Sequence, residues 1–274
     1  GNDYTLIGIA LGAYGLTQAI LQIPFGWLSD RIGRKPVIYM GLILFAIGSL
    51  IAALAIDIYW VILGRVIQGA GAISAAVMAL AADLTREEHR TKAMATIGMT
   101  IGTVFAISLI VAPVLNQWIG VPGIFAMTGV LALLAMIVVK KIIPDPQISR
   151  FHSDTEASAA SFGSVLRDTQ LLRLNYGIFA LHATLMGLWL VVPLTLRQAG
   201  MEANDHWQIY LPVLLLSIVL IIPAIIYAEK KAQLKFVFIA AIALLLIGQV
   251  LLAIAFDSIW GTAIALLVFF TAFN

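Results

Sequence analysis

Long apolar runs are the feature that most constrains the fold of this 274-residue chain. Crossing the hydrocarbon core of a bilayer takes about 20 mostly apolar residues in a helix, and nine runs reach or approach that length. They are Leu6–Leu28, Val37–Ile56, Trp60–Ala82, Met94–Leu115, Pro122–Val139, Leu172–Leu196, Trp207–Ala228, Phe236–Phe256 and Trp260–Asn274. Because lipid offers a peptide backbone no hydrogen-bond partners, such continuous runs predict helices. The expected fold is therefore an all-α polytopic membrane protein with about nine helices.

The composition agrees with this class and excludes several others. Hydrophobic residues make up 62% of the chain and charged residues 11%, whereas soluble domains are about 45–50% apolar and about 25% charged. The chain contains no cysteine, so disulfide and thiol chemistry are excluded. We recognise no phosphate-binding loop, metal-ligand cluster or nucleophile–base pair. The sequence therefore predicts no enzyme, no cofactor, no metal site and no nucleic-acid partner.

The positions of the basic residues predict how the chain is oriented. Of the 16 lysines and arginines, 14 lie in alternate loops, Arg197 lies in an opposite loop, and Arg65 lies inside a span. The 14 are Arg31, Arg34, Lys35, Arg86, Arg90, Lys92, Lys140, Lys141, Arg150, Arg167, Arg173, Lys230, Lys231 and Lys235. Because cytoplasmic loops carry excess positive charge, we expect these loops in the cytoplasm and the residues before Leu6 outside. An outside start requires an earlier membrane segment, so we expect a helix upstream of Gly1.

An internal repeat predicts two related halves. Three positions match in residue type at an offset of 199: Pro24 with Pro223, Asp30 with Glu229, and Arg31 with Lys230. At an offset of 200, Ala55–Trp60 matches Ala255–Trp260. Six spans separate the matching segments, so the repeat unit is six helices and the two halves have the same orientation.

A charged, glycine-punctuated turn separates the first two spans. It reads Gly26-Trp27-Leu28-Ser29-Asp30-Arg31-Ile32-Gly33-Arg34-Lys35. This stretch resembles the signature loop between the second and third helices of the major facilitator superfamily. The resemblance implies a twelve-helix transporter of two six-helix halves, seen here from helix two into helix ten. It also implies a bacterial inner-membrane location with this loop in the cytoplasm.

Three regions follow from this reading. We expect an N-terminal half at residues 1–143, a cytoplasmic linker at 144–170, and part of a C-terminal half at 171–274. The linker holds two prolines and shows no periodicity. Phe162, Val165, Leu166 and Thr169 share one helical face, which predicts either a short helix on the membrane surface or only the start of the next span.

The resemblance assigns a conformational lock to the signature loop. Asp30 would pair with basic residues of the loop and with the start of helix eleven, which holds the cytoplasmic side closed. Glycines at 26 and 33 would let helices approach closely. The lock residues are Gly26, Asp30, Arg31, Gly33, Arg34 and Lys35. The alternative is a positive-inside anchor alone, which does not call for an acid at this spacing.

Two residues within the spans are candidates for proton coupling. Arg65 lies in Leu63–Gly71, which resembles the fourth-helix motif whose arginine is linked to coupling in antiporters. An arginine there costs about 2.5–3.5 kcal/mol, although a side chain near the helix start can also extend outward to the interface. His182 lies near the middle of its span, and histidine is the side chain type that exchanges protons near physiological pH; alternatively it is a neutral hydrogen-bonding group.

Polar and aromatic side chains along several spans predict contacts with a solute. Tyr14, Gln18 and Gln22 are spaced four residues apart, and Gln68 follows Arg65 by one helical turn. The resemblance places the other candidates on helices seven and ten, which line a central cavity. The full predicted substrate-binding set is Tyr14, Gln18, Gln68, Met186, Trp189, Phe273 and Asn274.

The predicted function is secondary active transport by alternating access of two halves. Gln22–Gly26, Gly64–Arg65 and Leu84–Glu87 are most similar to the drug:proton-antiporter-like branch, which implies a monomer in the lipid bilayer that exports a small amphiphilic solute in exchange for protons. Only Pro113 remains of the antiporter motif on helix five. A proton-independent metabolite uniporter and a transport-inactive sensor or scaffold are the alternatives.

We predict that residues 1–274 alone do not transport, because helix one, helices eleven and twelve and part of helix ten would be missing. Purified protein of this length, reconstituted in liposomes, should show no solute uptake above that of empty liposomes. Uptake by the fragment would contradict this prediction.

Overall fold

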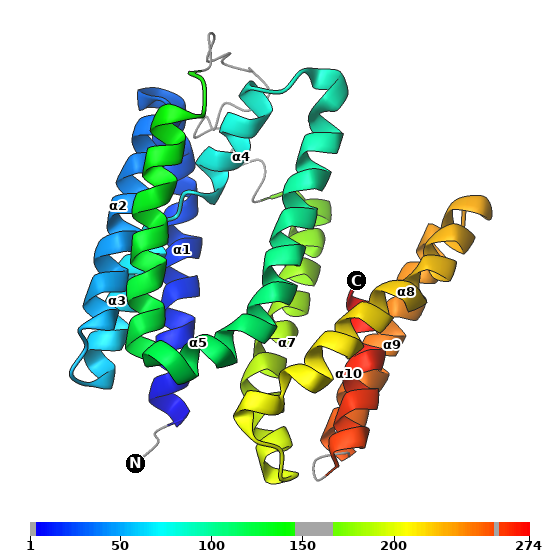
Figure 1. Cartoon of the computed structure of the whole chain (residues 1–274). Helices are drawn as coiled ribbons and strands as arrows, with labels where there is room; N and C mark the ends of the chain where they lie inside the picture. The colour runs from blue at the N-terminus through cyan, green and yellow to red at the C-terminus, as the bar shows by residue number, and fades with distance from the viewer. Residues whose placement is uncertain (1–3, 146–166, 255–257) are drawn as a thin grey trace. The chain divides into compact units, whose positions relative to one another are not determined.

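The computed structural model describes residues 4–145, 167–254 and 258–274, and every regular element within them is helical. The elements, traced in Figure 1, are α1 (Tyr4–Ile32), α2 (Arg34–Ala53), α3 (Ile58–Ala70), α4 (Ser74–Asp83), η1 (Glu87–His89), α5 (Arg90–Lys141), α7 (Thr169–Gln198), η2 (Ala203–Asp205), α8 (Trp207–Lys230), α9 (Leu234–Ile254) and α10 (Ile259–Phe273). The predicted all-α class is confirmed.

The helices account for the predicted membrane spans. In the described part of the chain, 7 helical segments are long and apolar enough to cross a membrane, and α10 is a shorter apolar helix. One of these segments joins α3 to α4, and another, Glu87–Lys141, contains two predicted spans. Each of the nine predicted spans therefore has a helical counterpart, and the chain is a multi-pass membrane protein.

The third span is interrupted, and the prediction of one continuous helix over Trp60–Ala82 was wrong here. Helix α3 ends at Ala70 and α4 begins at Ser74. A side-chain carbon at Gly71 would collide with the backbone oxygen of Gly41 on α2. Glycine is a weak helix former, and this close backbone contact stabilises a break that the apolar pattern did not reveal.

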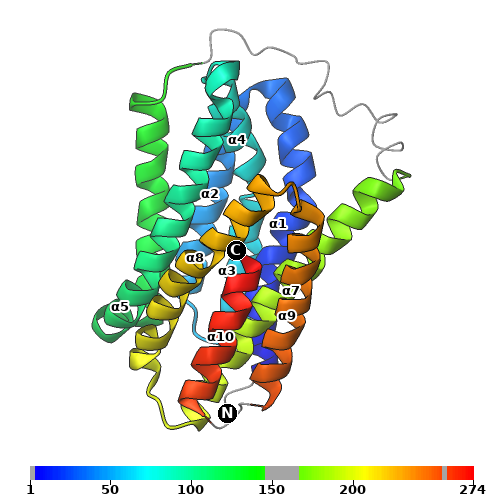
Figure 2. The same cartoon turned by 90° about the vertical axis from the view of Figure 1, so that its right-hand side faces the viewer.

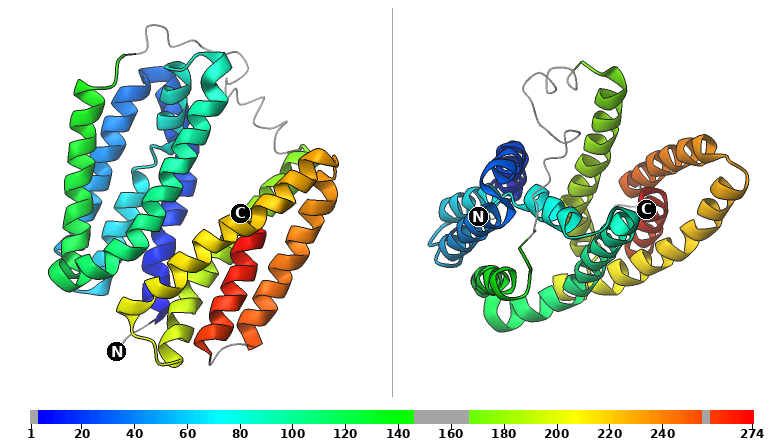
Figure 3. Two further views of the ribbon diagram at one scale, coloured as in Figure 1. Left: turned by 45° about the vertical axis from the view of Figure 1, so that its right-hand side comes forward. Right: turned by 90° about the horizontal axis from the view of Figure 1, so that it is seen from above.

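Helix α5 contains a sharp turn at Gly120. Its φ of 65° and ψ of 177° lie in a region that is essentially restricted to glycine. The turn separates a helical stretch at residues 90–119 from another at 121–141, and Figure 3 shows the reversal of the chain there. Both stretches are longer than the predicted spans Met94–Leu115 and Pro122–Val139.

The described chain forms two compact units. The first comprises Gly1–Gly102 and Leu115–Phe162, and the second comprises Thr103–Val114 and Gly163–Asn274. Residues 103–114 fall within the predicted N-terminal half but belong to the second unit by their contacts. The expected surface helix lies largely in residues 146–166, outside the described residues. The N-cap of α7 is Asp168, whose carboxylate accepts hydrogen bonds from the amides of Gln170 and Leu171 at 2.9 and 3.3 Å.

Each unit has its own apolar core. In the first unit, residues 121–141 of α5 pack beside α2, as Figure 1 shows, and the buried residues are Val37, Ile38, Leu42, Ala76, Leu80 and Ala132. In the second unit, α8, α9 and α10 form a layer seen in Figure 2, and the core is Leu188, Val192, Leu196, Tyr210, Val213, Leu266, Phe269 and Phe270.

Glycines bring α2 and α3 into backbone contact. A side-chain carbon at Gly48 would lie 2.5 Å from the backbone oxygen of Gly64, and one at Gly64 would lie 2.7 Å from that of Gly48. The second unit uses a related contact, because a side-chain carbon at Gly248 would lie 3.1 Å from the backbone nitrogen of Phe269. Gly48 and Gly248 are separated by the offset of 200 found in the sequence, so α2–α3 and α9–α10 are corresponding hairpins.

We predict that Gly48→Ala destabilises the full-length protein by about 1–3 kcal/mol, the usual cost of overpacking. Gly98→Ala is the matched control, because none of the described residues comes within 4 Å of a side-chain carbon there. It should leave stability unchanged or raise it by up to about 1 kcal/mol. Chemical denaturation in detergent micelles measures both effects, and equal effects of the two substitutions would contradict the packing argument.

Candidate functional site

The turn between α1 and α2 is a single residue, Gly33. Its φ of 98° is a backbone conformation that L side chains rarely adopt, which explains why glycine is needed there. Helix α1 ends at Ile32 and α2 begins at Arg34, so the charged residues on both sides of the turn lie close together. Gly26 lies further back on α1, where a side-chain carbon would be in ordinary contact, at 3.6 Å, with the Cβ of Ala75.

Arg34 is the centre of a polar network at this turn. Its Nη1 pairs with the carboxylate of Asp30 and donates a hydrogen bond to Ser29 Oγ at 2.8 Å. Its Nε pairs with the carboxylate of Asp83 at 3.2 Å. The Arg34 side chain is 12% exposed and that of Asp83 is 7% exposed, so one guanidinium joins the end of α1, the start of α2 and the end of α4.

Ser29 and Asp83 did not appear among the sequence candidates. Asp83 lies at the last residue of α4 and closes an apolar span, which was a usable signal. It went unnoticed because the two residues of the Arg34–Asp83 pair are 49 positions apart. Only the packing of α4 against α1 and α2 brings them together.

The remaining basic residues of the turn make different contacts. The guanidinium of Arg31 lies over the ring of Trp27, 3.7 Å from its centroid. Lys35 Nζ donates to the backbone oxygen of Ile143 at 2.6 Å and pairs with Asp145 at 2.7 Å. The Asp145 side chain is 86% exposed, so this ion pair contributes little. Lys35 nevertheless connects the turn to the chain just after α5.

A second polar cluster surrounds Arg65 within the membrane-spanning part of the first unit. Its Nη1 donates to Gln68 Oε1 at 2.9 Å, and its Nε donates to the Ala10 backbone oxygen at 3.4 Å. The guanidinium also lies over the Tyr14 ring, 4.2 Å from the centroid, in the geometry of a cation–π contact. Three of the predicted residues, Tyr14, Arg65 and Gln68, are thus in direct contact.

The cluster extends inward through Gln68. Gln68 is 2% exposed, and its Nε2 donates to Ser49 Oγ at 2.6 Å. The hydroxyl of Thr128 on α5 lies 3.4 Å from the same oxygen. Ser49 and Thr128 were not predicted, because an isolated hydroxyl in an apolar span carries no periodic signal. Gln18 lies outside this cluster and donates to Ser74 Oγ at 3.4 Å.

Aromatic rings connect most of the predicted residues of the second unit. The ring of His182 meets that of Phe273 at 6.3 Å, and Phe273 stacks on Phe269 at 5.8 Å. Trp189 contacts the rings of Phe270 and Tyr210 at 6.1 and 5.2 Å. Offset and edge contacts of this kind stabilise aromatic clusters. His182 Nδ1 lies 2.9 Å from the Ile178 backbone oxygen of its own helix.

The last two predicted residues, Met186 and Asn274, are not aromatic and have other surroundings. Met186 is 63% exposed. Asn274 Nδ2 donates to Ser217 Oγ at 2.9 Å, which links the end of α10 to α8. The structure therefore distributes the predicted solute contacts over both units, with Tyr14, Gln18 and Gln68 in the first and Met186, Trp189, Phe273 and Asn274 in the second.

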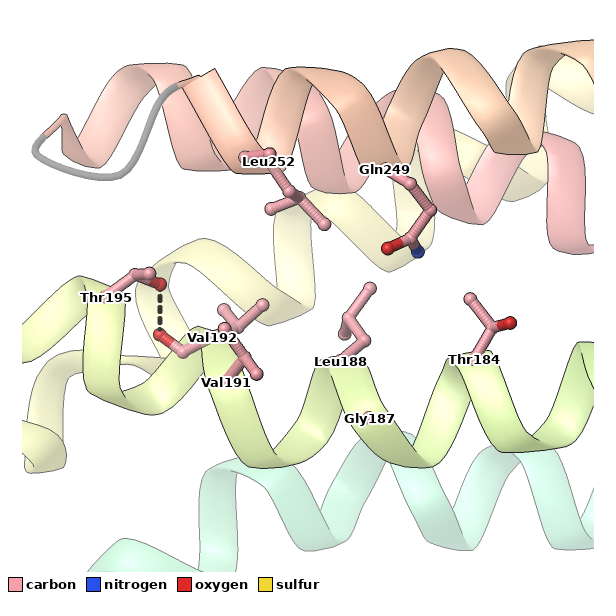
Figure 4. A pocket seen from close by; sticks show the side chains of 9 residues that line it. Thr184, Gly187, Leu188, Val191, Val192, Thr195, Gln249 and Leu252 are labelled. Atoms are coloured by element: carbon pink, nitrogen blue, oxygen red, sulfur yellow. Dashed lines mark hydrogen bonds between the residues drawn. The ribbon is translucent and has the colours of Figure 1, made fainter.

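A cavity of about 520 Å³ lies between α7 and α9 in the second unit. It is lined by Thr184, Gly187, Leu188, Val191, Val192, Thr195, Gln249, Leu252 and Ala253. Figure 4 shows the Gln249 amide on the side of α9 that faces α7. The buried amide nitrogen of Gln249 has no hydrogen-bond partner among the described residues. A single amide in an otherwise apolar span was the available sequence signal.

The family model described as Major Facilitator Superfamily matches residues 1–274. The chain belongs to the major facilitator superfamily. Within it, the chain is 44% identical over 274 residues to the inner membrane transport protein YajR of Escherichia coli (strain K12), with 100% of this chain and 60% of YajR covered. This similarity agrees with the branch predicted from Gln22–Gly26, Gly64–Arg65 and Leu84–Glu87. The chain thus spans less than two thirds of the length of YajR.

Other similar proteins agree with this assignment. An uncharacterized transporter of Buchnera aphidicola subsp. Acyrthosiphon pisum is 33% identical over 276 residues, with 100% of this chain and 70% of that protein covered. The crystal structure of a D-xylose-proton symporter matches with a TM-score of 0.66 at 19% identity, covering 98% of this chain and 70% of that one. The inward-open xylose transporter XylE from E. coli matches with a TM-score of 0.60 at 18% identity, with the same coverage. The structural matches confirm the superfamily fold.

We predict that Arg34→Ala lowers the unfolding free energy of the full-length protein by about 3 kcal/mol, because removing one partner leaves the buried carboxylate of Asp83 uncompensated. Arg31→Ala is the control at the same turn and should cost less than about 1 kcal/mol, the loss of an exposed cation–π contact. Denaturant titration in micelles compares the two. Similar losses of unfolding free energy in the two variants would contradict a stabilising role for the network around Arg34.

Proposed function

We propose that the full-length protein exports a small amphiphilic solute across the bacterial inner membrane in exchange for protons. The two halves would alternate access to a central site. The orientation follows from the basic loops, with the α1–α2 turn in the cytoplasm. The 44% identity to YajR, named as an inner membrane transport protein, supports both the membrane and the transport class.

The proposal of proton coupling rests on the interactions of Arg65. This arginine lies in an apolar helix and is held by a ring, an amide and a backbone oxygen. Among the described residues, no carboxylate forms an ion pair with it. A charge within a membrane span has a high free-energy cost, and such charged residues usually mark functional sites. We infer that the Arg65 guanidinium, which stays charged, changes its interactions when a proton or an anionic group arrives during the transport cycle.

The network around Arg34 supports the proposed lock. Its ion pairs with Asp30 and Asp83 join three helix ends of one unit, so the cytoplasmic end of that unit would move as one body. A lock must also release, and partly exposed ion pairs are suited to that because solvent compensates them when they separate. Asp30, whose side chain is 34% exposed, is the partner best placed to exchange.

The chemistry of the second unit supports an amphiphilic solute. The rings of Trp189 and Phe273 offer apolar faces. Polar groups come from His182, on the same helix as Trp189, and from Asn274, which follows Phe273 at the end of α10. Sites with mainly apolar walls and a few polar groups bind solutes that combine both characters. The D-xylose-proton symporter shares the fold at 19% identity, which supports the fold and not a sugar substrate.

A proton-independent uniporter is the second candidate, and the distribution of acids favours it. In the described part of the chain, the carboxylates lie in loops or at helix ends, as Asp30, Asp83 and Asp168 illustrate. A proton carrier within these spans would then have to be His182. Carboxylates elsewhere in the full-length protein would remove this objection.

The test measures proton movement in proteoliposomes that contain the full-length protein and an internal pH-sensitive dye. A panel of lipophilic cations and small metabolites is added to wild type, Arg65→Ala and the control Arg197→Ala, which alters a basic residue in the last turn of α7. We expect solute-dependent proton movement in wild type and the control and a loss of at least about tenfold in Arg65→Ala, equivalent to about 1.4 kcal/mol. Solute flux without proton movement would favour the uniporter, and equal proton movement in all three would remove Arg65 from the coupling mechanism.

A further inference from the structure

A directed chain of hydrogen bonds leads from Arg65 into the interior of the first unit. Arg65 donates to Gln68 Oε1 at 2.9 Å, Gln68 Nε2 donates to Ser49 Oγ at 2.6 Å, and Ser49 donates to the Phe45 backbone oxygen at 2.7 Å. Gln68 is 2% exposed and Ser49 is 0% exposed. The chain thus joins α3 to α2 through two fully desolvated side chains.

The chemistry of each group allows only one direction for this chain. A guanidinium has donors only, so Gln68 must turn its oxygen toward Arg65. The amide nitrogen of Gln68 must then face Ser49, and it needs an acceptor there. Ser49 can accept because its single proton is already directed to Phe45. The orientation of the amide is therefore set from both ends.

Close packing holds Ser49 in this position. A side-chain carbon at Gly48 would collide with the backbone nitrogen of Gln68. On the other side, a side-chain carbon at Gly129 would lie 3.2 Å from Ser49 Cβ, and the Thr128 hydroxyl lies 3.4 Å from Ser49 Oγ. Glycine on both sides lets α2, α3 and α5 converge on one hydroxyl group.

We propose that Ser49 is a positioning residue that holds the guanidinium of Arg65 in place through the amide of Gln68. Without the Ser49 oxygen, the buried amide nitrogen loses its acceptor, and an unpaired buried group is costly. The amide then rotates to find another partner, and its oxygen no longer faces Arg65. The consequence for transport rests on the proposed coupling role of Arg65, whereas the positioning itself does not.

The first experiment tests positioning independently of transport. Phenylglyoxal, which reacts with arginine side chains, is applied to the full-length protein in liposomes, and peptide mapping follows the modification of each arginine. In Ser49→Ala we expect Arg65 to react about fivefold faster than in wild type, with Arg197 as the internal reference. Fivefold corresponds to about 1 kcal/mol, the usual net contribution of one hydrogen bond. An unchanged rate at Arg65 would overturn the proposal.

Two further variants separate positioning from general disruption. Thr195→Val removes another hydroxyl that is 2% exposed, but this hydroxyl donates within its own helix, to the Val192 backbone oxygen at 2.8 Å. It should leave the Arg65 rate unchanged. Ser49→Cys keeps the shape of the side chain, with a slightly larger terminal atom that is a weak acceptor, so its Arg65 rate should lie between those of wild type and Ser49→Ala. If Ser49→Ala fails to fold, an Arg65 rate in Ser49→Cys equal to that of wild type would overturn the proposal.

The second experiment measures solute-driven proton movement against pH for the same variants. We expect Ser49→Ala to reduce it about fivefold and to change its pH profile, and to have no further effect in an Arg65→Ala background. A faster Arg65 reaction together with unchanged proton movement in both Ser49→Ala and Arg65→Ala would refute the coupling role and leave the positioning role in place. Loss of proton movement in Arg65→Ala with an unchanged Arg65 reaction in Ser49→Ala would refute the positioning role and leave the coupling role in place.

Discussion

The backbone contact between α2 and α3 is the interaction on which the polar interior of the first unit depends. Gly48 and Gly64 allow the two helices to approach so closely that a side-chain carbon at either would lie 2.5 to 2.7 Å from an oxygen of the other helix. At that separation a short side chain such as Ser49 reaches Gln68, which also contacts Arg65 one turn earlier on α3. Within a membrane the hydrophobic effect does not drive helices together, so such close packing and interhelical hydrogen bonds are the main sources of helix association. The same glycines therefore support both stability and the placement of the charge.

Two arginines of one unit illustrate two solutions to the burial of a cation. Arg34 lies at a helix junction and is neutralised by Asp30 and Asp83, so it acts as a structural link between helix ends. Arg65 lies within an apolar span and is held by a ring, an amide and a backbone oxygen, groups that orient the charge without neutralising it. A paired charge stabilises one arrangement of helices, whereas an unneutralised charge remains able to respond to a proton or a solute. This difference is why we assign locking to the first and coupling to the second.

The internal repeat places different chemistry on the same scaffold. Gly48 and Gly248 occupy corresponding positions in two helix hairpins, and each allows a close approach to the next helix. The next residue is Ser49 in the first unit and Gln249 in the second. Ser49 is saturated with hydrogen bonds, while the buried amide nitrogen of Gln249 has no partner among the described residues and lies at a cavity between α7 and α9. The scaffold is shared because packing depends on glycine spacing, and the chemistry differs because a different side chain follows each glycine.

The sequence by itself determined the helical class, the positions of nine spans, the repeat and the superfamily, because each depends on patterns that are local or periodic along the chain. It also singled out Asp30, Arg34, Arg65 and Gln68 as candidates, since charged and amide groups near or within apolar runs are conspicuous. The tertiary structure alone decided the break at Gly71, the partners Asp83 and Ser49, and the cavity beside Gln249. These features arise where residues far apart in the chain meet, and a small or singly polar residue carries no sign of its future neighbour. Contacts between helices, unlike helices themselves, are set by packing in three dimensions.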